Sequence, residues 1–234
     1  MRQIRSEDFA KYRDERLMTI KPSTLRRQLN VLRHALRTAG KEWGWSVPQL
    51  ALAQVQIPPV AHFYVGRITD DVVAKLLAAA ECQSNPCIAF SIRLALQTGM
   101  RRGELLGLDW GDVDLDKKQL LIRTSKNGRP RMIPLSPLAV VLFKGKISAN
   151  AKGSVLPITV NGLRLGFERA RALARVELRF HDLRHEAISR LFDIGLTIPE
   201  VQLISGHRTL SQLSRYSHPD IKRLVGKLAV QCEE

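Results

Sequence analysis

Residues 180–192, FHDLRHEAISRLF, put an arginine where a core side chain is expected. Apolar residues recur at three- and four-residue spacing after His181, which predicts a helix with one buried face. Arg184 lies one turn before Ile188, in line with that face. A buried guanidinium is costly unless an anion meets it. Glu186, the nearest acid, lies two positions on and points away, so Arg184 is a candidate ligand for an external anion.

Four further polar positions stand out in the same way. Arg101 begins a helical turn that becomes apolar at once, in TGMRRGELLGL, so its guanidinium is expected to be half-buried. Lys126 lies at the tip of an expected hairpin, His207 follows a helix-ending glycine, and Tyr216 lies on a short helix. Each of these last three has an ordinary structural explanation alone: a solvated lysine, a capping histidine and a packed tyrosine.

Taken as one set, these residues match the needs of phosphoryl transfer. Two guanidinium groups can clamp the non-bridging oxygens of one phosphate and stabilise the charge that grows in the transition state. Tyrosine has a pKa near 10, so about one side chain in a thousand is ionised at pH 7, a deficit of roughly 4 kcal/mol. A pocket of cations can recover that deficit. A lysine or a histidine can protonate the leaving 5′-oxygen.

The sequence gives no sign of a metal site or of any other cofactor. It lacks the acidic cluster that binds magnesium in two-metal nucleases. His181 and His185 are four residues apart, but no nearby carboxylate or cysteine completes a metal site. Cys82, Cys87 and Cys232 lack metal-type spacing, and we interpret them as reduced packing thiols of a cytoplasmic protein.

The elements that position this set are expected to be mostly helical, with a small antiparallel β-sheet. Asn127-Gly128 is a strong turn signal between QLLIRT and RPRMIPL, which predicts a hairpin, and DVDLD is a third strand candidate. Thr69 is placed to cap a helix, and Gly99 to end one. Residues 11–45 are expected to be helical, and Pro22 and Ser23 suit a helix entrance. Further helices are expected from 70 onward and at 86–98, 136–144, 160–175, 181–192, 198–205, 209–216 and from about 220.

Composition indicates a folded protein with an anionic partner. Hydrophobic residues make up 44%, and 37 basic against 22 acidic residues give a net charge of +15. Such a surplus favours DNA, RNA or an acidic membrane surface, but no apolar run approaches the roughly 18 residues that span a bilayer. The double proline in QVQIPPVAHFYVGR predicts an extended linker. We therefore expect a small helical domain at 1–58, a linker at 59–66 and a catalytic domain at 67–234.

In order and spacing, the polar set resembles the motifs of the tyrosine recombinases, the phage-integrase family. TGMRRGE fits the first motif with the first of its paired arginines in the catalytic place, and the TSKNGRPRMIPL hairpin supplies the lysine. HDLR and a later Gly-His pair fit the next two motifs, and a tyrosine follows nine residues after that histidine. Each motif is weak alone, but all five in order are highly specific. The matching residues are Arg101, Lys126, His181, Arg184, His207 and Tyr216.

The resemblance implies a metal- and ATP-independent enzyme that cuts and rejoins DNA. Tyr216 would attack the scissile phosphate and form a 3′-phosphotyrosyl link, and Arg101 and Arg184 would bind that phosphate. Lys126 would protonate the leaving 5′-oxygen. Of the two histidines in the set, the first would assist proton transfer and the second would hydrogen-bond the phosphate.

The resemblance also implies double-stranded DNA as the partner and a homo-tetramer on DNA, joined through the helix after 219. FHDLRHEAISR and ISGHR look most like shufflon-type DNA invertases. Residues 1–58 look like a partial, SAM-like core-binding domain, so the expected chain is truncated or compact at its start. Three alternatives stay open: a type IB topoisomerase-like nicking-closing enzyme, a catalytically idle DNA-binding relative, and a basic helical RNA-binding protein. The target site and the choice among integration, excision and inversion are also open.

Overall fold

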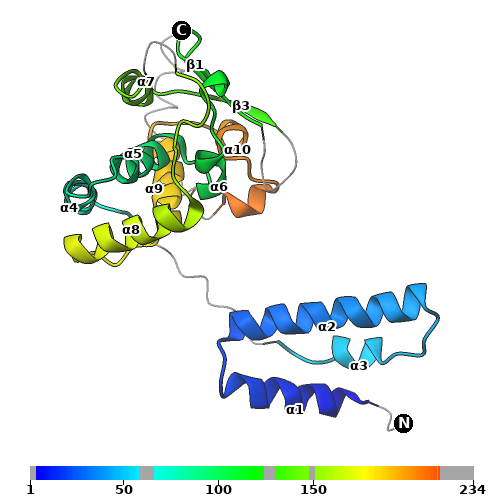
Figure 1. Cartoon of the computed structure of the whole chain (residues 1–234). Coiled ribbons are helices and arrows are strands. Elements are labelled where there is room, and N and C mark those ends of the chain that lie inside the picture. The colour runs from blue at the N-terminus through cyan, green and yellow to red at the C-terminus, as the bar shows by residue number, and fades with distance from the viewer. Residues whose placement is uncertain are drawn as a thin grey trace, which may run out of the picture. The chain divides into compact units, whose positions relative to one another are not determined.

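The computed structural model describes residues 4–57, 59, 66–123, 130–147, 151–214 and 216, and it divides into two compact units, Met1–Tyr64 and Val65–Glu234 (Figure 1). Each unit is described by itself. In the described part, the first unit contains α1 (Ser6–Leu17), α2 (Pro22–Glu42) and α3 (Gln49–Ala53). The second contains α4 (Asp70–Glu81), α5 (Cys87–Thr98), α6 (Arg102–Leu106), η1 (Trp110–Asp112), β1 (Val113–Asp114), β2 (Gln119–Ile122), β3 (Arg131–Pro134), α7 (Pro137–Lys144), α8 (Val160–Ala174), α9 (Phe180–Asp193), α10 (Ile198–Ser205) and η2 (Leu210–Gln212).

The first unit is a small helical bundle in which α1, α2 and α3 pack on one another. The helical segment expected over 11–45 is two helices: α1 ends at Leu17, and α2 starts at Pro22, where a helix entrance was predicted. Proline fits the first turn of a helix but keeps the preceding residue extended, and Lys21 accordingly has ψ 149°. The helix α3 was not predicted. The core of this unit is formed by Phe9, Leu25, Leu29, Leu52 and Val55.

The second unit is built around α5, which is buried along almost its whole length. It packs against α4, α7, α8 and α9, and α4 also packs along α8 (Figure 1). Two predicted helix ends are confirmed. The side chain of Thr69 accepts a hydrogen bond from the backbone N–H of Val72, and Gly99 ends α5 in the left-handed conformation at φ 62°.

The predicted strands form one three-stranded antiparallel sheet in the order β1-β2-β3. Leu120 of β2 pairs with Ile133 of β3, and both are buried, so the inner face of the sheet joins the core of the second unit. Lys126 and the predicted Asn127-Gly128 turn lie outside the described residues. The described ends of the hairpin, at Ile122 and Arg131, are paired with each other.

The last helical elements of the described chain are α10 and η2. Helix α10 ends at Gly206, which has φ 66°. The short helix expected over 209–216 is a single 3₁₀ turn, η2, and the tail helix expected from 220 lies outside the described residues. Within the described part, no helix is both long and apolar enough to cross a membrane.

Candidate active site

Arg184 lies on the inner face of α9 and is only 3% exposed. Its guanidinium donates to the carbonyl oxygens of Gly99 and Ser205, both at 2.6 Å. These two carbonyls lie at the C-terminal ends of α5 and α10, where helix geometry leaves them without an intrahelical partner. Both oxygens carry only partial negative charge. The guanidinium is therefore fixed in place by two helix ends, but these contacts do not neutralise it.

Arg101 lies beside it at the start of α6, with a side chain 23% exposed. It donates to Oε1 of Glu104 at 2.8 Å and to the carbonyl of Gly206 at 3.0 Å. Oε2 of Glu104 accepts a hydrogen bond from the backbone N–H of Arg101 at 2.9 Å. One carboxylate thus caps the helix and orients the guanidinium that the sequence motif singled out.

Arg131 of β3 is a third arginine of the site, with a side chain 12% exposed, and it belongs to none of the sequence motifs. Its guanidinium makes a bidentate pair with Glu104, at 3.0 and 2.9 Å, and its Nε donates to the carbonyl of Ile204 at 3.1 Å. A signal was present in the sequence: Arg131 and Ile133 are two apart on a strand, so they share a face, and Ile133 is buried.

These four side chains form what we call the arginine cluster: Arg101, Arg131, Arg184 and Glu104. Burial disfavours the charged form of Glu104, but hydrogen bonds from Arg131 and Arg101 outweigh burial and lower the pKa of this carboxyl. Burial, and then the positive charge of Arg101, lower the pKa of Arg184 to about 10. Three positive charges stand against one negative charge, a local excess of +2. The cluster is thus suited to hold an anion.

Gly206 and His207 follow Ile204 and Ser205, whose carbonyl oxygens accept hydrogen bonds from Arg131 and Arg184. A side chain at Gly206 would come within 2.8 Å of the Arg131 guanidinium, so both its φ and its surroundings require glycine. Nδ1 of His207 is 2.7 Å from Oγ of Ser205, and its carbonyl accepts a hydrogen bond from Gln202 at 3.0 Å. The loop that carries His207 is therefore tied to α10.

Tyr216 is half-buried and lies against α9. Its hydroxyl is hydrogen-bonded to Nδ1 of His185, and the two rings are stacked with centroids 5.5 Å apart. The ring centroids of His207 and Tyr216 lie 6.4 Å apart. Tyr216 also packs on the apolar group of Ile188, Val201 and Leu213.

His181 occupies the first turn of α9 and is exposed. Its ring contacts that of His185 edge to face, with centroids 4.7 Å apart. Desolvation by the surrounding protein, and then the positive charge of Arg184, lower the pKa of His181. Arg101, Arg184 and His207 are thus held at the end of α10, through Gly206 and Ser205. His181 and Tyr216 both contact His185, and Lys126 lies outside the described residues. In the described part, no group of three or more potential metal ligands is gathered.

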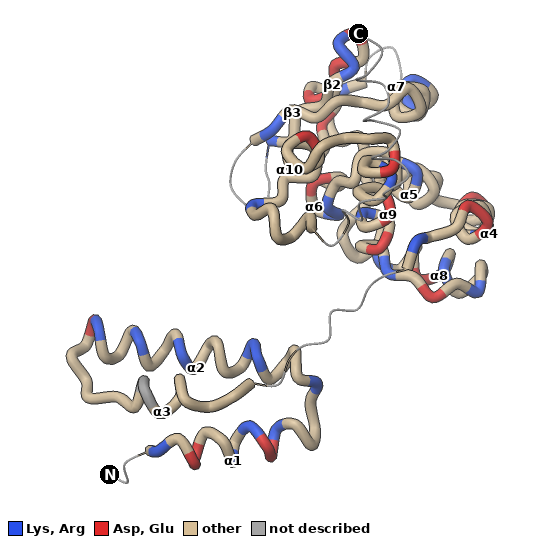
Figure 2. Tube along the Cα trace, turned by 180° about the vertical axis from the view of Figure 1, so that it is seen from behind, with Lys and Arg blue, Asp and Glu red and all other residues tan. Residues whose placement is uncertain are grey.

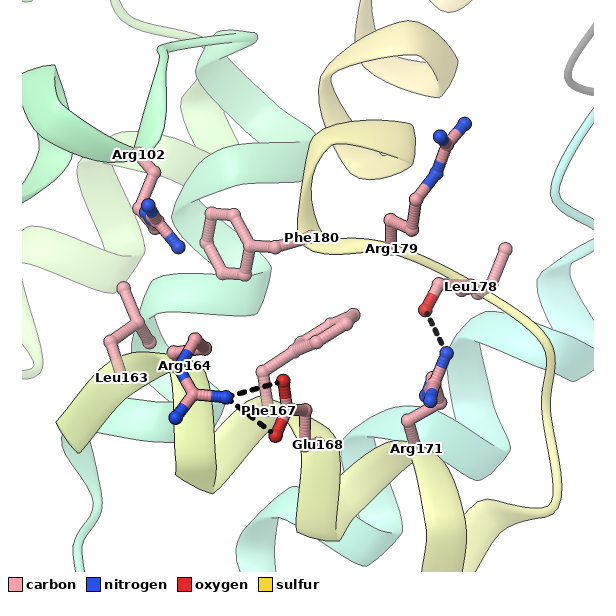
Figure 3. Close-up of a pocket in the computed structure, with 9 residues that line it drawn as sticks. All are labelled: Arg102, Leu163, Arg164, Phe167, Glu168, Arg171, Leu178, Arg179 and Phe180. Carbon is pink, nitrogen blue, oxygen red and sulfur yellow. Dashed lines mark hydrogen bonds and ion pairs between the residues drawn. The ribbon is translucent and has the colours of Figure 1, made fainter. Parts of the chain in front are cut away.

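A pocket of about 260 Å³ is lined by residues of α8 and of the starts of α6 and α9 (Figure 3). Phe167 of α8 and Phe180 of α9 form its apolar wall, edge to face at 5.3 Å. Arg102 follows Arg101 directly, and Phe180 precedes His181, so the pocket shares elements with the site. Its polar lining is Arg102, Arg164, Arg171, Arg179 and Glu168, an excess of three positive charges.

The architecture is that of solved DNA integrases. A lambda integrase (75–356) dimer bound to a COC′ core site superposes with a TM-score of 0.76 at 21% identity, covering 93% of this chain and 84% of that one. The Tn1549 transposon integrase in complex with a circular intermediate DNA gives 0.76 at 15%, covering 97% and 85%. At such identities the likeness concerns the fold, and it confirms the mostly helical class with a small antiparallel sheet.

Sequence comparison identifies the family. The phage integrase family model matches residues 66–223, and the chain belongs to this family. It is 36% identical to the shufflon-specific DNA recombinase of Escherichia coli over 238 residues, which confirms the expected likeness to shufflon recombinases. That match covers 97% of this chain and 61% of the relative's length. Tyrosine recombinase XerC of Corynebacterium efficiens is 32% identical over 146 residues, covering 57% and 47%.

Proposed function

We propose that this chain is a site-specific DNA recombinase that cuts and rejoins DNA through a 3′-phosphotyrosyl link to Tyr216. The observation that carries the proposal is the arginine cluster, with its excess of +2, next to a half-buried tyrosine. A diester phosphate carries one negative charge and gains a second as a nucleophile adds to it. A cluster preorganised by carbonyls and by Glu104 stabilises that gain without rearranging.

The proposed reaction uses the six residues of the sequence motifs. The Tyr216 oxygen bonds to phosphorus while the bond from phosphorus to the 5′-oxygen breaks, and that oxygen takes a proton from Lys126. Arg101 and Arg184 hold the non-bridging oxygens, His181 assists proton transfer, and the ring of the histidine after Gly206, His207, donates to the phosphate. The covalent link keeps the energy of the broken bond, so neither ATP nor a metal is required.

The partner in this proposal is double-stranded DNA. Alongside the cleavage site, the arginine-lined pocket supports contact with the sugar-phosphate backbone. In the first unit, α2 carries basic residues at intervals and has Glu42 as its only acid (Figure 2). We propose that 1–58 is a partial core-binding domain, 59–66 a linker and 67–234 the catalytic domain. A tetramer joined through residues after 219 is the proposed working assembly.

A suicide substrate tests this function. DNA with a nick next to the cleavage site loses its short 5′-hydroxyl fragment after cleavage, which traps the covalent complex. We expect an adduct of the protein with the 3′ end, formed in EDTA and absent in Tyr216→Phe. An adduct that persists in Tyr216→Phe, or that needs magnesium, would contradict the mechanism. Exchange between two duplexes, and not mere relaxation of supercoils, separates a recombinase from a nicking-closing enzyme.

A further inference from the structure

His185 contacts Tyr216 but belongs to none of the sequence motifs. It follows Arg184 on α9 and is half-buried. Its Nδ1 is hydrogen-bonded to the hydroxyl of Tyr216, and the stacked rings, with centroids 5.5 Å apart, hold that nitrogen at the phenolic oxygen. The proposed nucleophile thus already has an imidazole at its reactive atom.

The charges around His185 come from several elements. His181 and Arg184 lie on its own helix, Arg101 lies at the start of α6, and His207 follows α10. His181 contacts the ring edge to face, and Arg184 is buried one residue away. A proton added to His185 would therefore join a site that already has a positive excess. The arrival of a DNA phosphate, which brings negative charge to the same cluster, offsets this repulsion.

We propose that His185 is the general base that takes the phenolic proton of Tyr216 as the tyrosine attacks. This inference rests on the proposed function and assigns a step that the six motif residues leave open. In the neutral tautomer with the proton on Nε2, Nδ1 accepts the hydrogen bond from Tyr216. The Oη–H bond breaks, its proton goes to Nδ1, and Oη bonds to phosphorus as the 5′-oxygen leaves. On rejoining, the 5′-hydroxyl returns its proton to Lys126 and attacks phosphorus, the bond from phosphorus to Oη breaks, and His185 returns its proton to Oη.

The chemistry of the two groups suits this transfer. In water, imidazole titrates near 6.5 and phenol near 10, so the proton moves only when something stabilises the phenolate or consumes it. Bond formation to phosphorus consumes it. The step becomes favourable once the scissile phosphate lies against Arg101 and Arg184.

The test measures single-turnover adduct formation on the suicide substrate between pH 6 and pH 9, in the full chain and in His185→Gln. Glutamine keeps a hydrogen bond to the phenol but cannot take its proton. At pH 7 we expect a loss of about a hundredfold or more, the usual scale of general base catalysis. The wild-type rate should level off once imidazole is neutral. The variant's rate should rise about tenfold per pH unit, as the phenolate fraction does. Binding of intact DNA should change less than about threefold, because the backbone contacts remain.

His207→Gln is the matched control, since it makes the same substitution at the other histidine near Tyr216. It should lose rate with a pH profile parallel to the wild type. In a second substrate, sulfur replaces the bridging 5′-oxygen, and the thiolate leaves without needing a proton. This substrate should rescue Lys126→Ala, whose defect is the missing acid, and should not rescue His185→Gln.

The outcomes are separable. A wild-type chain that forms no adduct at all would refute the proposed function. Adduct formation with a His185→Gln rate equal to the wild type, faster than it, or reduced with a parallel pH profile would overturn only the role of His185. Rescue of His185→Gln by the sulfur substrate would make it a general acid instead and would equally overturn this assignment.

Discussion

The arginine cluster and the arginine-lined pocket use the same residue type in opposite ways. In the cluster, the guanidinium groups of Arg131 and Arg184 are largely or wholly buried, and helix-end carbonyls and one carboxylate fix their direction. In the pocket, Arg102 and Arg164 are exposed, and Arg164 pairs with Glu168 across one turn of α8 (Figure 3). Fixed charges stabilise a transition state, whereas exposed ones attract a polyanion and are screened by salt.

The largest expected effect comes from emptying one position of the cluster. Arg101→Ala and Arg184→Ala should each slow adduct formation by about a hundredfold or more, the scale for loss of one preorganised contact to the transition state. DNA binding should fall far less, because other phosphate contacts remain. Single-turnover cleavage and a binding isotherm on the same substrate measure the two effects.

Arg102→Ala is the control for that comparison, because Arg102 neighbours Arg101 in sequence but lines the pocket. Its cleavage rate at low salt should stay within a few fold of the wild type. Equal losses in Arg101→Ala and Arg102→Ala would refute the motif alignment and erase the distinction between cluster and pocket. Unfolding curves of all three variants show whether a loss reflects folding.

The second prediction removes the negative charge of the arginine cluster. Glu104→Gln leaves the three guanidinium groups of the cluster, one buried and two partly buried, without the carboxylate they surround. We expect a loss of roughly 1.5–3 kcal/mol in unfolding free energy, typical of charged hydrogen bonds. The folded-state pKa of Glu104 is lowered, so its contribution is present above the unfolded value and disappears as pH falls through the folded one. The gap between wild type and variant should therefore be full near pH 7 and narrow below about pH 4.

Denaturant unfolding at several pH values measures this gap. A gap that stays constant from pH 7 down to acid would mean that the charge of Glu104 does not stabilise the cluster. Added phosphate or sulfate should stabilise the wild type, whose excess of positive charge attracts anions, and should stabilise Glu104→Gln more. Arg164 pairs with the exposed Glu168, and Glu168→Gln should change stability by less than about 0.5 kcal/mol.

Several features of the fold and the site could be predicted from the sequence, because they depend on local patterns. The apolar spacing after His181 predicts both α9 and the burial of Arg184, and the structure confirms both. Thr69 and Gly99 predict helix ends through backbone chemistry alone. Such features depend on neighbours within about one helical turn, which the sequence displays directly.

The partners of the buried arginines could not be predicted, because they come from distant segments. Arg184 contacts carbonyls of Gly99 and Ser205, which belong to two other helices. Arg131 reaches Glu104 across 27 positions, and only its register with a buried isoleucine hinted at its burial.

The third prediction compares two glycines that both adopt the left-handed conformation. An alanine at Gly99 would make only ordinary contacts, the nearest at 3.6 Å, so Gly99→Ala should cost about 1 kcal/mol of backbone strain. An alanine at Gly206 would also press on the Arg131 guanidinium, and we expect roughly 2–3 kcal/mol. Thermal and denaturant unfolding of both variants measure the difference.

Cleavage adds a second readout to the glycine pair. Displacement of Arg131 would loosen its hold on Glu104 and therefore on Arg101, so Gly206→Ala should slow adduct formation well beyond Gly99→Ala at matched temperature. Similar rates in the two variants would show that Arg131 does not position the cluster.

The smallest expected effect concerns the salt dependence of DNA binding. If the pocket faces the DNA backbone, Arg102→Ala removes one phosphate contact and should lower the slope of log K against log salt by about 0.9. Arg184→Ala should change the slope by a similar amount, since it also removes one contact, although its cleavage defect is far larger. The two variants would then look alike in binding and differ by about two orders of magnitude in chemistry, as expected when exposed and fixed charges do different work. Titrations of a single duplex from about 50 to 200 mM salt measure both slopes. If the slope of Arg102→Ala equals that of the wild type while the slope of Arg184→Ala falls as expected, DNA reaches the cluster without touching the pocket.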